Sequence, residues 1–206
     1  RTSFLRPAMV SAIGSRDSAE HLEALVSHLS NVAPSLPEPV MAQSLETGGL
    51  ADLFGWASRN VLRHGVGLAS GLADCANFRF LNTGADYQKT AQSYQNCLAD
   101  EARGHALTAS FGVAAVAEWR HDKVLAVLSL MSDGSDTPVW VCEHLWGPAN
   151  SQVPDGVAKS VTVALRQRGI LTLAQTAPPG TPRVLLDRYC DRPDYLTLLL
   201  RDLEEG

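Results

Sequence analysis

Apolar residues recur every three or four positions near the start of the chain, a spacing typical of amphipathic helices. Residues 17–31 begin with a sequence resembling a capping box and predict the first helix. Residues 50–62 predict a second helix, with Gly65 as its stop. Because Trp56 lies off the apolar stripe of this second helix, we expect its side chain to be partly exposed.

Three further segments carry the same periodicity. Residues 86–103 predict a polar surface helix, which we expect to end at Gly104. Residues 156–168 predict a helix capped by Asp155 and stopped by Gly169. An amphipathic helix with a leucine face is expected over residues 193–205.

Two nearly continuous apolar runs give the strongest signal in the chain. Residues 112–119 and 123–131 flank a short polar turn and are rich in valine, alanine and leucine, as expected of paired strands buried on both faces. Residues 139–145 and 170–176 predict two more strands. The predicted fold is therefore α+β, with a central antiparallel sheet and flanking helices. Its expected core includes Val113, Val116, Val127 and Leu130.

Length and composition limit the organisation of the chain. Its 206 residues suit one main domain with appendages. We expect a basic arm, helix and proline-rich connector over residues 1–39, the α+β domain over residues 40–176, and an extension with a terminal helix over residues 177–206. With 17 basic and 22 acidic residues the net charge is −5, which argues against nucleic acid as a partner.

Cysteine usage and the amino-terminal composition bear on the compartment. The four cysteines are widely separated and form no CxxC pair, which favours an intracellular reducing compartment. No apolar run is long enough to cross a bilayer, so we expect a soluble protein that does not span a membrane. The first 16 residues are rich in arginine and serine and contain no acid. They match either the flank of a processed mitochondrial or plastid transit peptide or a basic arm with an arbitrary start.

One residue pair resembles a metal or nucleophile site. Cys142 and His144 fall on one face of a predicted strand, so their side chains could share a metal ion. Two ligands do not make a zinc site, and a buried cysteine beside a surface histidine is the favoured interpretation. We therefore expect no bound metal and no cofactor. The polar residues of the predicted turn, Glu118, Arg120, His121 and Asp122, are expected to be solvated rather than catalytic.

Residues 65–134 combine a Gly-Val-Gly-Leu segment at 65–68, the polar helix that follows, and the paired runs at 111–117 and 124–130. In this combination they resemble the GAF family of ligand-sensing and regulatory domains. The resemblance implies a small-ligand site between the sheet and its helices. The candidate walls of that site are Phe78, Phe80, Leu81, Trp119 and Trp140.

Two main functional hypotheses follow. The first is a non-enzymatic GAF-like sensing or regulatory domain that binds a small ligand or a partner protein. The alternative is an accessory structural subunit of a larger assembly, with other protein subunits as partners through its terminal segments. An enzyme of unknown class is a third hypothesis, although the sequence places no nucleophile, base and orienting group together.

Overall fold

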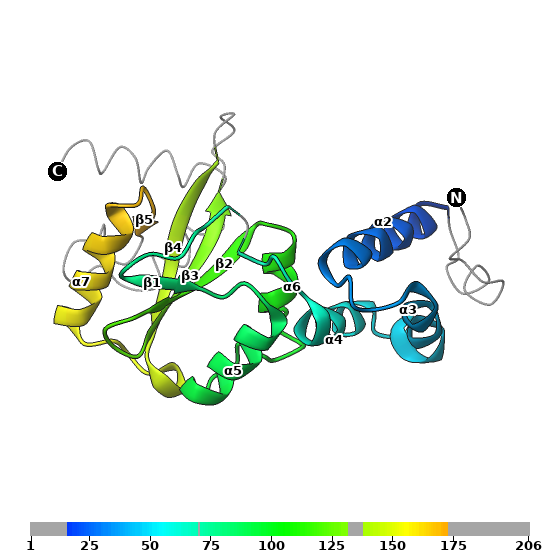
Figure 1. Ribbon diagram of the computed structural model, residues 1–206, viewed down its shortest axis with the longest axis horizontal. Coiled ribbons are helices and arrows are strands. Elements are labelled where there is room, and N and C mark those ends of the chain that lie inside the picture. The colour runs from blue at the N-terminus through cyan, green and yellow to red at the C-terminus, as the bar shows by residue number, and fades with distance from the viewer. Residues whose placement is uncertain (1–15, 70, 132–137, 173–206) are drawn as a thin grey trace. The chain divides into compact units, whose positions relative to one another are not determined.

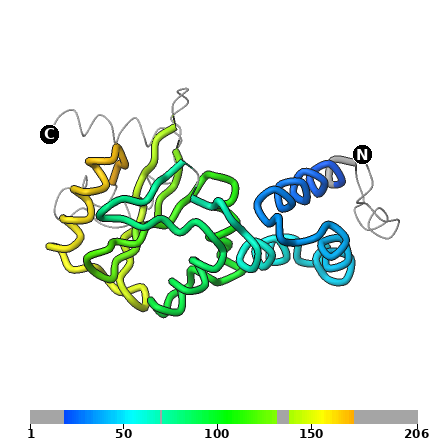
Figure 2. The backbone as a smooth tube through the Cα atoms, viewed as in Figure 1, coloured from blue at the N-terminus to red at the C-terminus, as the bar shows by residue number. Residues whose placement is uncertain are grey.

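The computed structural model describes residues 16–69, 71–131 and 138–172, and it confirms the α+β class (Figure 1). The chain divides into two compact units. The first comprises Arg1–Leu72 and Leu81–Gly112, and the second comprises Ala73–Phe80 and Val113–Gly206. Among the described residues, helices make up the first unit, and the sheet lies in the second (Figure 2). The three-part division expected from the sequence stays a prediction.

Helix α4 is the centre of the first unit, and the other helices of this unit surround it. It begins where the Asp52 carboxylate accepts a hydrogen bond from the Gly55 backbone N–H, at 3.0 Å. Gly65 follows its last turn as the C-cap, as predicted. The helical elements are α2 (Arg16–Val32), α3 (Glu38–Ser44), a π-helical turn (Leu45–Gly49), α4 (Leu53–His64), α5 (Gly84–Tyr94) and α6 (His105–Ser110).

Two aromatic side chains on α4 have the opposite burial to that expected from the sequence. Trp56 is buried, with 3% of its surface exposed, so the expectation of partial exposure was wrong. Its indole Nε1–H donates to the Ser44 hydroxyl of α3 at 3.0 Å, because α3 and the turn after it cover this side of α4. Phe54, which lies on the expected apolar stripe, is instead 51% exposed.

The polar helix ends earlier than predicted. Thr83 and Asp86 form a capping box at the start of α5, and Gln95 ends the helix in the left-handed conformation with φ of 52°. Irregular turns occupy residues 95–104. Gly104, expected as a helix stop, is instead the N-cap of α6, with φ of 62°.

In the part of the chain that the structure describes, the sheet of the second unit has five strands in the order β1-β2-β3-β4-β5. Pairing is antiparallel from β1 to β4, and β5 joins β4 in parallel after the crossover through α7. The predicted hairpin is confirmed as β2 and β3, with Val116 opposite Val127. The elements are β1 (Phe78–Phe80), β2 (Ala114–Trp119), β3 (Val124–Met131), β4 (Val139–Trp146), a short 3-10 turn (Pro148–Asn150), α7 (Asp155–Arg166) and β5 (Leu171–Thr172).

The expected core residues divide between the two ends of the hairpin. Val116 and Val127 are buried, with 3% and 7% exposed, as predicted. Val113 was wrongly placed in the core, because it precedes β2 and is 47% exposed. Leu130 lies within β3 but is only half-buried, since burial along β3 decreases after Leu128. The core therefore lies at the turn end of the hairpin.

Helix α7 begins at Asp155, one residue earlier than predicted, so this residue lies in the first turn and makes no side-chain cap. Gly169 follows the helix with φ of 73°, as expected of a stop residue. Only residues 171 and 172 of the predicted strand 170–176 form β5; residues 173–176 and the predicted helix 193–205 lie outside the described residues. Among the residues described, no helix combines the length and apolarity needed to cross a bilayer.

Candidate functional site

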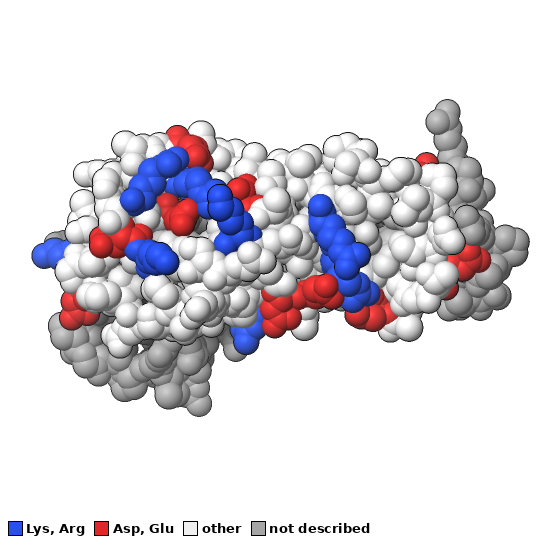
Figure 3. All heavy atoms as spheres, turned by 60° about the horizontal axis from the view of Figure 1, so that its bottom comes forward, with Lys and Arg blue, Asp and Glu red and all other residues white. Residues whose placement is uncertain are grey.

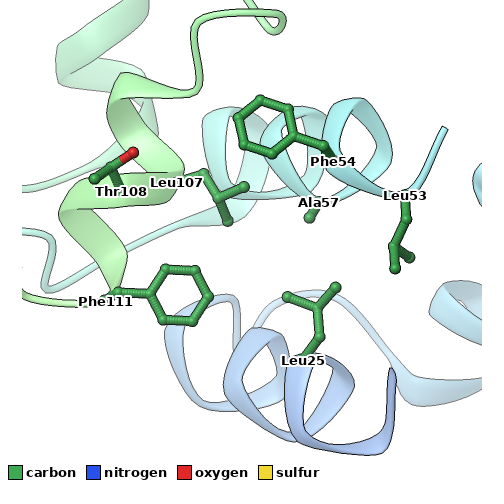
Figure 4. A pocket seen from close by; sticks show the side chains of 7 residues that line it. All are labelled: Leu25, Leu53, Phe54, Ala57, Leu107, Thr108 and Phe111. Carbon is green, nitrogen blue, oxygen red and sulfur yellow. The ribbon is translucent and has the colours of Figure 1, made fainter. Parts of the chain in front are cut away.

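An apolar groove of about 490 Å³ lies within the helical unit, where side chains of α2, α4 and α6 converge (Figure 4). Its floor includes the buried residues Ala57 and Leu107. Its full lining is Leu25, Leu53, Phe54, Ala57, Leu107, Thr108 and Phe111. All seven belong to one compact unit, so the groove is a property of that unit alone.

Phe54 forms one wall of the groove, and its ring packs against the backbone at Gly104. Its ring lies against Gly104, and a Cβ atom at position 104 would overlap the ring. Glycine is also the residue that most readily adopts the positive φ found there. The glycine therefore supports the ring from behind, while half of the Phe54 surface stays open to solvent.

Phe111 forms another wall, and its ring packs against the imidazole ring of His28. Its ring stacks on His28 of α2, with centroids 4.1 Å apart and planes at 10°. The Ser110 hydroxyl donates to the Leu107 carbonyl oxygen, so it accepts from Nε2–H of His28 at 2.9 Å. Burial lowers the pKa of His28, which favours this neutral form. Phe111 is thus held in place although it is 49% exposed.

The lining of the groove has little polar chemistry. Thr108 is its single polar residue, and its hydroxyl donates to the Gly104 carbonyl oxygen at 3.0 Å. Small-molecule sites usually add several convergent polar groups to an apolar wall, and these fix the ligand's orientation. The groove is therefore best suited to apolar side chains.

A second, charged hollow of about 630 Å³ lies beside the groove and shares Phe54 as a wall. Its charged residues are Asp52, Arg59, Asp100 and Glu101. The Arg59 guanidinium bridges two of the carboxylates, at 3.1 Å from Glu101 and 3.5 Å from Asp52. One guanidinium thus faces three carboxylates, so the hollow carries excess negative charge.

The predicted aromatic ligand site corresponds to a packed cluster in the second unit. Phe78 and Trp119 are opposite each other on β1 and β2, with ring centroids 5.0 Å apart. Phe80 lies beside them, and these three side chains are 0–8% exposed. Leu81 belongs to the other unit, and Trp140 is half-buried on β4. Neither hollow above is lined by these five residues, whose role in ligand binding stays a prediction.

A β-bulge in β4 separates Cys142 from His144. Leu128 pairs with Cys142 and Val127 with His144, so Glu143 is the extra residue on β4. Cys142 is buried, whereas His144 is exposed and stacks on Trp146. The expectation that both side chains share a face was therefore wrong. Within the described parts of the chain, no group of three or more His, Cys, Asp or Glu residues is arranged to hold a metal ion.

The polar residues of the predicted turn have structural partners. Glu118 receives two hydrogen-bonding contacts from Arg79 across the β1–β2 pair, at 2.8 and 2.9 Å. Arg120 is exposed, donates to the Cys75 carbonyl oxygen and forms a 2.8 Å ion pair with Asp74. These contacts fasten the turn to the segment that carries β1. On the face that Figure 3 shows, basic and acidic side chains lie close together in mixed clusters.

The groove was not predicted from the sequence. Phe111 and Thr108 lie on or next to a six-residue helix, which is too short for a recognisable period. Phe54 and Phe111 carry no sequence signal of their own, because Gly104 and His28, which support their rings, are distant in the chain. These contacts form only when the three helices are placed together.

Comparison with known proteins gives no match, whether to a family model, a curated protein or a solved structure. The functional argument therefore rests on the geometry of the groove and its surroundings.

Proposed function

We propose that this chain is a non-enzymatic binding module whose helical unit holds an apolar helix of a partner protein in the groove of α2, α4 and α6. Under the first hypothesis, the chain is a regulatory domain that binds a partner protein through this groove. Under the alternative, an accessory subunit would bind its neighbour in the assembly through the same groove. The GAF-like resemblance of residues 65–134 favours the regulatory form.

One observation carries the proposal: two half-exposed phenylalanines, Phe54 and Phe111, are fixed from behind on the walls of a single apolar groove. Large apolar side chains that stay exposed in an isolated chain are typical of interaction surfaces when they gather in one place. Rigid support also lowers the entropy cost of binding, because the rings are already placed.

The form of the groove favours a helix as its occupant. Helices that dock in apolar grooves insert side chains spaced three or four residues apart. The groove is open, has one polar lining residue and is bordered by helices of the same unit. A small polar molecule would lose its hydration there and gain few hydrogen bonds in return.

Selection from a displayed library of helical peptides, about 16 residues long and varied on both faces, tests the proposal. We expect the chain to select peptides with apolar residues at helical spacing. Thr108→Arg should abolish their binding, because it places a long cation in the groove from an exposed position.

The matched control is Val40→Arg, which introduces the same side chain at a 50% exposed position of the same unit, outside the groove lining. Both variants should keep the wild-type circular dichroism spectrum. Failure to select any peptide, or equal binding by the wild type and Thr108→Arg, would overturn the proposal.

A further inference from the structure

The charged hollow beside the groove is not electrically balanced. Asp52, Asp100 and Glu101 contribute three carboxylates, and Arg59 contributes one guanidinium. Arg103 approaches Asp100 at 3.7 Å from outside the lining, which still leaves one negative charge in excess among the side chains that the structure describes there. These side chains are all at least one third exposed, so their mutual attractions are weak and a further cation can join them.

The hollow and the groove lie on opposite sides of the Phe54 side chain. Phe54 lines both, so a helix seated on the apolar side of Phe54 has its edge close to the carboxylates. An acidic side chain at that edge would be repelled, and a lysine or arginine would be attracted. The excess negative charge therefore selects among helices that all satisfy the apolar groove.

We infer that the partner is a basic amphipathic helix, with large apolar side chains in the groove and a lysine or arginine reaching Asp100 and Glu101. This inference rests on the proposed function and adds the charge of the partner to it. Electrostatic complementarity of this kind mainly sets the choice of partner and the rate of association.

The tightest peptides from the selection serve as probes, measured by fluorescence anisotropy against the full chain. We expect them to be enriched in lysine and arginine at one border of the apolar face. Asp100→Asn combined with Glu101→Gln should weaken their binding about fivefold to tenfold, and added salt should weaken the binding to wild type. The control Asp122→Asn with Asp155→Asn changes the net charge equally in the other unit and should change binding less than about twofold.

A double-mutant cycle locates the contact. Replacing the border lysine of a selected peptide with glutamine should cost affinity for wild type and cost nothing further in the Asp100→Asn/Glu101→Gln variant. The inference is overturned if the selected peptides are neutral or acidic, or if the hollow variant binds them as wild type does. In either case a loss of binding in Thr108→Arg still supports the proposed function.

Two other outcomes also decide the matter. Binding that survives Thr108→Arg overturns the proposed function itself, and this inference with it. Sedimentation that shows a wild-type dimer which Thr108→Arg dissociates would identify a second copy of this chain as the occupant, and would overturn the basic-helix partner.

Discussion

The tip of the Phe54 ring lies so close to Gly104 that a Cβ atom at position 104 would displace it. Helix α4 and the N-cap of helix α6 are thereby in direct contact. The half-exposed Phe54 side chain is thus packed on one side against the backbone at Gly104.

Replacing this glycine should damage both stability and binding. In Gly104→Ala, the alanine must adopt the left-handed backbone conformation found at this position, which costs about 1–2 kcal/mol of stability. Its Cβ atom also displaces the Phe54 ring. Gly67→Ala is the matched control, since Gly67 also has a positive φ but has no atom within 4 Å of its Cβ position. Urea unfolding should show a larger loss of stability for Gly104→Ala. Equal losses would contradict the close packing.

The helical unit should lose stability in mild acid. Burial lowers the pKa of His28, and it also lowers that of His105, aided by Arg103 and opposed by Asp100. The unfolded chain therefore binds protons at a higher pH than the folded chain, and stability is fully present above about pH 6.5 and falls as the pH drops through that value.

Urea unfolding between pH 8 and pH 5 measures this loss. His28→Gln keeps a hydrogen-bond donor for Ser110 and removes one titrating group, so its unfolding free energy should depend less on pH than that of the wild type. His121→Gln, at an exposed position in the other unit, is the control. An identical pH profile for wild type and His28→Gln would be the contrary result.

Two cysteines of the second unit should differ widely in reactivity. Burial acts to raise the pKa of Cys75, but hydrogen bonds from the backbone of Asn77 and Phe78 and the Arg168 guanidinium outweigh it, so the pKa is lowered. Burial, with the nearby Glu143, raises the pKa of Cys142 to about 12. Because the thiolate is the reactive form, N-ethylmaleimide should label Cys75 first.

Peptide mass spectrometry after brief labelling of the native chain distinguishes the two thiols. Arg168→Ala should slow the labelling of Cys75, and unfolding in urea should make the two rates similar. Native labelling of Cys142 ahead of Cys75 would contradict the burial of Cys142.

The hairpin offers a direct comparison of buried and exposed valines. Val127→Ala should lower the free energy of unfolding by about 1–3 kcal/mol through lost burial and a small cavity. Val113→Ala, at a 47% exposed position, should change it by less than about 0.5 kcal/mol. Chemical denaturation of both variants gives the comparison, and similar losses would place the core elsewhere.

The parts of the fold that the sequence predicted are those with a strong local period. The hairpin of β2 and β3 and helices α2, α4 and α7 each bury a face that repeats along the chain. Strand β1 escaped prediction because it has three residues, and its pairing with Trp119 spans about forty positions. A short strand of this kind has no signal of its own until its partner is placed.

The candidate site was harder to predict than the fold. Trp56 and Phe54 are two residues apart on one helix, and their apolar character gives no indication of which is buried. The difference comes from Ser44, which accepts a hydrogen bond from Trp56, and from Gly104, which supports Phe54. Both belong to other elements, so the choice is made by tertiary contacts.

The path of the chain between its two units has a practical consequence. Strand β1 lies in the short segment Ala73–Phe80, and the chain returns to the helical unit before the remaining strands begin. No single cut therefore yields both units whole. A fragment that begins at Val113 would leave the edge of β2 without its strand partner, and such open edges promote aggregation. Separate production of the sheet unit would require residues 73–80 to be fused ahead of residue 113 through a new linker.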